Sequence, residues 1–202
     1  MRIEVPSAGT TSSEVSVRKA LGSLAAKSNV RPCEACAKTC QKCGSTTCRC
    51  QCSARCPDAA QMLSSEPDKF PIEAGIVPLV YVLADTGVIQ TIWSCEGHLQ
   101  PSGAELWKTP QVWFCSNDAS AAQLLSVALF DLRESLHCSD WLLRLVPIER
   151  GLTSVYSIEP RLEKHQDGAR MLGLLREDVQ TIAERLPTSL RGLAASLLPG
   201  RT

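Results

Sequence analysis

The sequence has no excess of charge of either sign. Its 21 Lys and Arg residues balance 21 Asp and Glu residues, so the formal net charge at pH 7 is zero. A chain without net charge has no overall basic field that attracts nucleic acid or an anionic membrane. Recognition of such a partner must therefore depend on a local cluster of side chains.

The sequence also lacks a long hydrophobic run. The longest one, residues 76–84, contains Pro78 and falls far short of the roughly 20 residues that cross a bilayer. Near the N-terminus, Glu4 interrupts the region in which a secretory signal needs continuous apolar residues. We therefore expect no transmembrane helix, no signal peptide and no membrane partner, and we expect a cytoplasmic protein.

The sequence does contain enough apolar residues for a hydrophobic core. Hydrophobic residues make up 44% of the 202 residues and charged residues make up 21%. These values are typical of globular proteins rather than of disordered chains. A chain of this length forms one ordinary domain with a small module, or two small domains.

Cysteine is the outlier of the composition. Eight of the 11 cysteines lie close together: Cys33, Cys36, Cys40, Cys43, Cys48, Cys50, Cys52 and Cys56. Two pairs of the Cys-x2-Cys type make a tetrahedral site of four thiolates, and the first four cysteines fit this pattern. The alternate spacing among the last four suits a second site or a shared polynuclear cluster. In a reducing cytoplasm, such crowded thiols are metal ligands more often than disulfides.

Zinc is the metal that we expect, at about two ions per chain, because paired Cys-x2-Cys ligands are typical of structural zinc sites. An iron–sulfur cluster is the first alternative. The ending Cys52-x3-Cys56-Pro57 is similar to the last two cysteines of a bacterial ferredoxin, although the preceding Cys-x2-Cys-x2-Cys spacing is absent. A set of disulfides in a secreted minidomain and a metallothionein-like metal buffer are further alternatives.

The residue pattern divides the chain into five segments. They are a tail with a short amphipathic helix (residues 1–30), a Cys-rich metal-binding module (31–58, the Cys module), a linker (59–71), an α+β domain (72–186) and a C-terminal tail (187–202). The Cys module has too few large apolar residues to bury a core of its own. Metal binding is therefore expected to supply its folding energy.

The α+β domain is predicted from hydrophobic periodicity. In order, its elements are helix 72–83, strand 88–94, strand 112–115, helix 118–136, strand 141–146, strand 154–158 and helix 172–186. Pro78 and β-branched residues leave a strand open as the alternative for the first helix. Strand pairs that alternate with helices favour a layered α+β domain with a largely antiparallel or mixed sheet over a doubly wound parallel one.

A second group of reactive side chains follows strand 88–94. Gly97 allows a sharp turn directly after Cys95. Cys95 and His98 have a spacing compatible with a shared metal or a thiolate–imidazolium pair, and Glu96 is a candidate acid, base or hydrogen-bond acceptor beside them. Cys95, Glu96 and His98 are thus the candidate catalytic residues. Alternatively, Cys95 is a buried packing residue, His98 caps a turn and Glu96 is solvated.

Three further residues are candidates for ligand binding. Ser94 and Gly97 belong to the same strand end, and Trp107 lies beside Lys108 in the polar loop that follows. A tryptophan in such a loop is available to stack on a base or another flat ligand. By contrast, Trp113 and Trp141 lie within predicted strands, where we expect them to pack in the core.

The segment Thr91-Ile92-Trp93-Ser94-Cys95-Glu96-Gly97-His98 resembles the Ser-Cys-Ser-Gly-Arg segment of the wybutosine-synthesising tRNA methyltransferase family. The resemblance covers fewer than ten residues. The matching positions are Thr91, Ser94, Cys95 and Gly97, while Glu96 and His98 stand where that family has Ser and Arg. The resemblance implies an α+β domain in which this strand-end loop is the ligand site.

Three functions are consistent with these patterns. The first is a zinc-binding cytoplasmic protein whose Cys module serves as a structural or partner-docking staple for an α+β ligand-recognition domain. Its expected partner is a macromolecule, RNA or protein, since the Cys module carries five cations against two acids. The second is an enzyme, RNA-modifying or otherwise, with a site at Cys95, Glu96 and His98. The third is an iron–sulfur redox protein.

Overall fold

A computed structural model describes residues 12–25, 63–64, 66, 68–116, 118–147, 154–162 and 167–198. The predicted Cys module lies outside these residues, and so do its eight cysteines. The expected zinc ions therefore stay a prediction. The other three cysteines, Cys95, Cys115 and Cys138, are free thiols in the described part of the chain.

The described residues form an α+β fold. Its elements are α1 (Ser12–Ala25), α4 (Val77–Asp85), β1 (Ile89–Leu99), β2 (Leu106–Ser116), α5 (Ala119–Leu132), the 3₁₀ turn η1 (Arg133–Ser135), β3 (Trp141–Val146), β4 (Val155–Pro160) and α6 (Gly168–Leu197). The four strands pair antiparallel in the order β1-β2-β4-β3. The structure thus confirms the predicted α+β class and has a purely antiparallel sheet.

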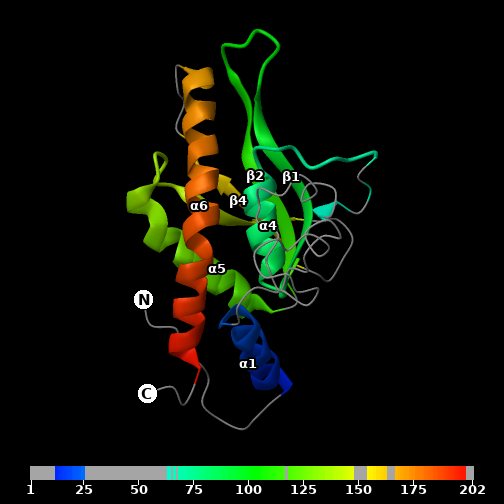
Figure 1. The fold of residues 1–202 in the computed structure, drawn as a ribbon, viewed down its shortest axis with the longest axis vertical. Coiled ribbons are helices and arrows are strands. Elements are labelled where there is room, and N and C mark those ends of the chain that lie inside the picture. Colours follow the sequence, from blue (N-terminus) through cyan, green and yellow to red (C-terminus); the bar gives the residue numbers. More distant parts are fainter. Residues whose placement is uncertain are drawn as a thin grey trace, which may run out of the picture.

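The helices form a layer on one face of the sheet, and the core lies between the two. Val112 and Phe114 of β2 and Ile158 of β4 are fully buried there against apolar residues of α4, α5 and α6. Helix α1 lies beside the C-terminal half of α6 (Figure 1) and adds Leu21 and Leu24 to the same core. None of the helices in the described residues combines the length and the apolar character that crossing a membrane requires.

Proline begins one helix and is tolerated inside another. Pro78 occupies the first turn of α4, where its missing N–H has no helical partner to lose. Pro187 lies inside α6, which continues to Leu197 where the sequence pattern placed a C-terminal tail. A proline in a helix interior costs about 3 kcal/mol, but Leu190 and Ala194 beyond it are buried in the core. Their packing explains why α6 continues.

A buried acid connects α6 to the segment before β3. Asp178 of α6 is 0% exposed. Its carboxylate accepts hydrogen bonds from the backbone N–H groups of His137 and Cys138, at 2.7 and 2.9 Å, and from the indole N–H of Trp141 at 3.1 Å. A buried carboxylate needs such donors to replace water. Asp178 therefore connects α6 to the segment between η1 and β3 and to the first residue of β3.

The β1–β2 hairpin extends beyond the rest of the sheet (Figure 1). Strand β4 pairs only with residues 112–115 of β2, so the outer half of β2 is bonded to β1 alone. Pro110, which the sequence pattern placed in a loop, lies in this outer half opposite Glu96. A proline fits there because no strand pairs with the other side of β2 at this position, so no hydrogen bond is lost when the residue has no backbone N–H.

Candidate functional site

The sequence pattern placed a strand end and a sharp turn at Gly97, but β1 continues through it to Leu99 and stays in register with β2 from Cys95 to His98. The φ of Gly97 is +84°, a conformation that residues with a Cβ rarely adopt. A Cβ at this position would lie 2.7 Å from Leu172 Cδ1 and 2.8 Å from Pro110 Cδ. In a regular strand, Cys95 and His98 would point to opposite faces. With Gly97 between them, their ligand atoms instead come within 4.8 Å of each other.

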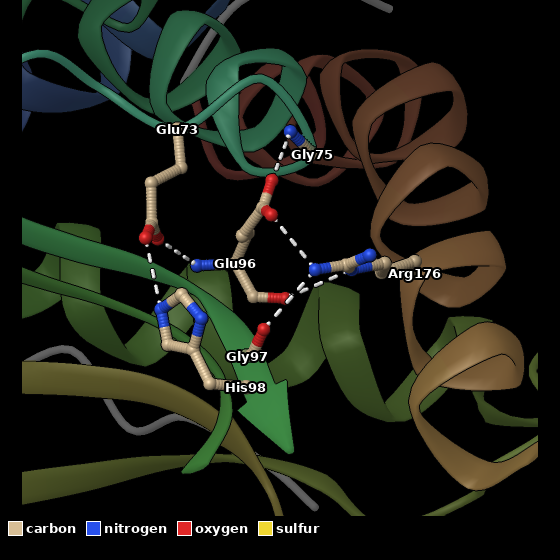
Figure 2. A network of polar contacts seen from close by, with 6 residues as sticks. All are labelled: Glu73, Gly75, Glu96, Gly97, His98 and Arg176. Atoms are coloured by element: carbon tan, nitrogen blue, oxygen red, sulfur yellow. Dashed lines mark hydrogen bonds and ion pairs between the residues drawn. The ribbon is translucent and has the colours of Figure 1, made fainter. Parts of the chain in front are cut away.

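Glu73, which precedes α4, joins these two residues from another part of the chain. Its Oε2 accepts a hydrogen bond from the backbone N–H of Glu96 at 2.7 Å, and its Oε1 lies 2.8 Å from His98 Nε2 (Figure 2). One donor atom each from Glu73, Cys95 and His98 lies within 4.8 Å of the other two, and no other such group occurs among the described residues. A thiol, an imidazole and a carboxylate thus meet at the edge of the sheet.

Glu96 is engaged on the α6 side of β1. Its Oε2 accepts the N–H of Gly75 at 2.7 Å, and its Oε1 lies 2.7 Å from Arg176 Nη2. Arg176 also donates to the backbone oxygens of Glu96 and Gly97, at 3.3 and 3.1 Å (Figure 2). The Glu96 carboxylate therefore joins three segments: β1, the turn before α4, and α6.

The Cys95 side chain is the buried member of the three. The residue is 3% exposed, and burial raises the pKa of its thiol, with the Glu73 charge acting in the same direction and a backbone hydrogen bond at Gly97 opposing both. The thiol is therefore protonated at neutral pH. Reactive cysteines are exposed and lie in electropositive surroundings, so this cysteine is a poor free nucleophile. A bound metal would deprotonate it.

A groove of about 810 Å³ runs along the outer edge of β1. Its lining includes Cys95, His98 and Glu73 together with Phe70, Trp93 and Lys108. Phe70 is 70% exposed and Trp93 is 41% exposed. The Nζ of Lys108 lies 5.9 Å from the centre of the Trp93 ring. The groove thus offers flat apolar surfaces and a cation beside the three reactive side chains.

The tryptophans of the hairpin have different surroundings. Trp93 pairs across the strands with Trp113, with ring centres 5.2 Å apart, and both lie on the face away from the core. Trp107 lies in β2 rather than in a loop, is 62% exposed and has the Lys108 Nζ 4.7 Å from its ring centre. Trp93 lines the groove, whereas Trp107 is not among its lining residues. Trp141 is buried, as its strand pattern indicated.

The structure therefore brings together part of the predicted site. Cys95 and His98 meet, Ser94 lines the groove and Gly97 shapes it. The Glu96 side chain lies with Arg176 instead. Sequence reasoning missed Glu73 and Arg176, which are 23 and 80 residues away from Glu96 in the chain. No local pattern marks either of them, because their roles arise from folding.

Comparison of the chain with known proteins gives no relative from which a role could be transferred. No family model, no curated protein and no solved structure matches it. The functional argument consequently rests on the site itself.

Proposed function

We propose that this protein is a zinc-binding cytoplasmic protein in which the Cys module stabilises or docks an α+β domain whose groove along β1 recognises a ligand. The groove is the observation that supports ligand recognition by the α+β domain, because exposed aromatic rings and a lysine rarely gather beside reactive side chains without a ligand. The zinc part rests on eight cysteines in a segment whose sequence has too few large apolar residues to bury a core. An iron–sulfur cluster in the same segment is the alternative cofactor.

RNA is the macromolecular partner that the groove favours. Phe70 and Trp93 present exposed rings, and Lys69 and Lys108 lie among the lining residues. Aromatic rings stack on unpaired bases, and each stack contributes about 1–3 kcal/mol to binding, while lysines contact the phosphates. The basic character of the Cys module adds to the same preference.

A peptide that adds a strand to β1 has less support. Strand addition needs free backbone N–H and C=O groups along the sheet edge. At the centre of the site, the backbone N–H of Glu96 already donates to Glu73, and its backbone oxygen accepts from Arg176. Side-chain stacking rather than backbone pairing is therefore the mode of recognition that we propose.

An enzyme with Cys95, Glu96 and His98 as catalytic residues also has less support. The Cys95 thiol is buried with a raised pKa, and the Glu96 carboxylate is bound to Gly75 and Arg176. A general acid or base must reach the proton that it transfers. Glu96 would have to leave both partners to do so.

Binding of a fluorescent single-stranded oligouridine by the full chain tests recognition. Trp93→Ala should weaken binding at least fivefold, because it removes one stacking surface. Phe130→Ala is the matched control. Phe130 on α5 is 61% exposed and has the Arg133 guanidinium 3.8 Å from its ring centre, but it lies outside the groove. Equal affinity for the wild type and Trp93→Ala, or no binding at low salt, would refute RNA recognition in the groove.

Metal analysis of the anaerobically purified chain tests the Cys module. We expect the eight clustered cysteines to hold about two zinc ions that withstand dialysis, apart from any ion bound elsewhere in the chain, and we expect a colourless protein, whereas an iron–sulfur cluster would absorb visible light. Fewer than one metal ion per chain together with eight freely titrating thiols would refute the metal-binding module.

A further inference from the structure

We infer that Glu73, Cys95 and His98 form a separate binding site for one divalent transition-metal ion, of which zinc is the best match. The site lies in the α+β domain and uses none of the eight clustered cysteines. Its ligands come from the segment before α4 and from β1, and their donor atoms lie within 4.8 Å of one another. The inference goes beyond the proposed ligand groove, because it holds even if the groove binds no RNA.

The donor set selects the class of metal. A thiolate, an imidazole and a carboxylate together suit zinc and its neighbours, whereas magnesium and calcium prefer oxygen ligands alone. The Cys95 thiolate and the Glu73 carboxylate would carry two negative charges, which a divalent ion neutralises. Lys108 also lines the groove, but its ammonium group has no lone pair and therefore cannot be a metal ligand.

The required movement is small. Zinc–ligand bonds of about 2.0–2.3 Å place the donors of a tetrahedral site about 3.3–3.8 Å apart. Distances of up to 4.8 Å between the three donor atoms must therefore shrink by about 1.0–1.5 Å. His98 Nε2 and Glu73 Oε1, which are 2.8 Å apart, must instead separate by about 0.5 Å. His98 and Glu73 have 38% and 36% of their side-chain surface exposed, so both are able to rotate. Cys95 is buried at the base of the groove lining and sets the position of the ion.

The surrounding contacts already orient the ligands. Glu73 Oε2 is fixed by the N–H of Glu96, which turns Oε1 toward His98 at 2.8 Å. Glu96 in turn accepts the N–H of Gly75, two residues after Glu73, and so fastens this segment to β1. Hydrogen bonds of this kind orient the ligands of metal sites and strengthen binding.

The ion would be accessible from the groove. All three ligands line it, and three protein ligands leave a tetrahedral ion one position for water or for an oxygen or nitrogen atom of a bound molecule. Sites with three protein ligands and one open position are typical of zinc ions that exchange ligands, whereas structural sites are closed by four. We therefore assign this ion a role in ligand capture rather than in folding.

Zinc content per chain tests the site in the full-length protein. Cys95→Ser and His98→Asn should each hold one zinc ion fewer than the wild type, whatever the Cys module retains. The matched control is the double variant His137→Asn/Glu177→Gln. His137 Nε2 lies 3.0 Å from Glu177 Oε2 in a more exposed pair, and this pair belongs to no group of three ligands among the described residues. Its zinc content should equal that of the wild type.

The wild-type protein provides a second measurement that does not depend on a variant folding correctly. The chain has three histidines, and the eight clustered cysteines offer zinc no imidazole. Zinc titration followed by NMR of the histidine ring nitrogens should therefore shift the signal of His98 and leave that of His137 in place. Unchanged signals of all three rings at saturating zinc would overturn the site, as would equal zinc contents of wild type and variants. If Cys95→Ser and His98→Asn hold no zinc at all while the wild type holds one ion, the result counts against zinc binding by the Cys module and not against this site.

Discussion

Glu96 on β1 and Arg176 on α6 form an ion pair with a distance of 2.7 Å between Oε1 and Nη2. They are 80 residues apart in the chain. Because Arg176 also donates to two backbone oxygens of β1, this pair aligns the edge strand with the longest helix. The position of Glu73, Cys95 and His98 depends on that alignment.

Replacing Arg176 by Ala should destabilise the fold by about 1–2 kcal/mol, because three hydrogen bonds to β1 are lost and the pair is partly screened by solvent. Urea unfolding measures the change. Arg170→Ala, at an exposed position of the same helix, is the control and should change stability by less than about 0.5 kcal/mol. Equal effects of the two substitutions would mean that the ion pair does not align β1 and α6.

Replacing Gly97 by Ala should destabilise the protein by about 2–3 kcal/mol, because it adds a clash to an unfavourable backbone conformation. Gly103 separates the two effects. It has a φ of +74°, similar to the +84° of Gly97, but a Cβ there would meet nothing within 4 Å. Gly103→Ala should therefore cost only about 1 kcal/mol. Thermal or urea unfolding of both variants checks the difference, and a smaller effect at Gly97 would contradict it.

Replacing Asp178 by Ala should destabilise the protein by about 3 kcal/mol, since one buried and two partly buried donors lose their acceptor. Asp178→Asn should recover part of the loss, because the amide oxygen still accepts a hydrogen bond. Asp131→Asn, at an exposed position of α5, should have almost no effect. Chemical unfolding measures all three, and a near-neutral Asp178→Ala would show that water replaces the carboxylate.

Stability should fall at alkaline pH through Cys138. Burial raises the pKa of its thiol, and the nearby Asp178 charge adds to the rise while a backbone hydrogen bond at Asp140 opposes it. The folded-state pKa of the thiol is higher than its ordinary value of 9.0. The stability that the neutral thiol contributes is therefore present below pH 9 and is lost as the pH rises through the folded-state pKa. The free energy of unfolding of Cys138→Ala should therefore decline less between pH 8 and pH 10.5 than that of the wild type. Parallel declines would indicate a thiol with an ordinary pKa in the folded state.

Local patterns predicted the secondary structure of the α+β domain in the observed order. Strand β3 has the predicted bounds, and α5 begins where it was predicted, with Asp118 capping it by accepting the N–H of Ser120. Boundaries were missed where long-range contacts outweigh local preferences. The hairpin pairing extends β2 through Pro110, and core packing extends α6 past Pro187.

The sequence by itself determined that the domain is α+β, because hydrophobic periodicity is a local property. Its three-residue spacing would place Cys95 and His98 on opposite faces of a regular strand, and their side chains meet in the folded strand, which passes through Gly97 with a positive φ. Only the tertiary structure decided which carboxylate joins them. Neighbouring Glu96 is drawn to Gly75 and Arg176, while distant Glu73 contacts His98. The physical reason is that the course of β1 at Gly97 and the packing of α6 decide the face on which each side chain lies, and neither can be read from residues close in the chain.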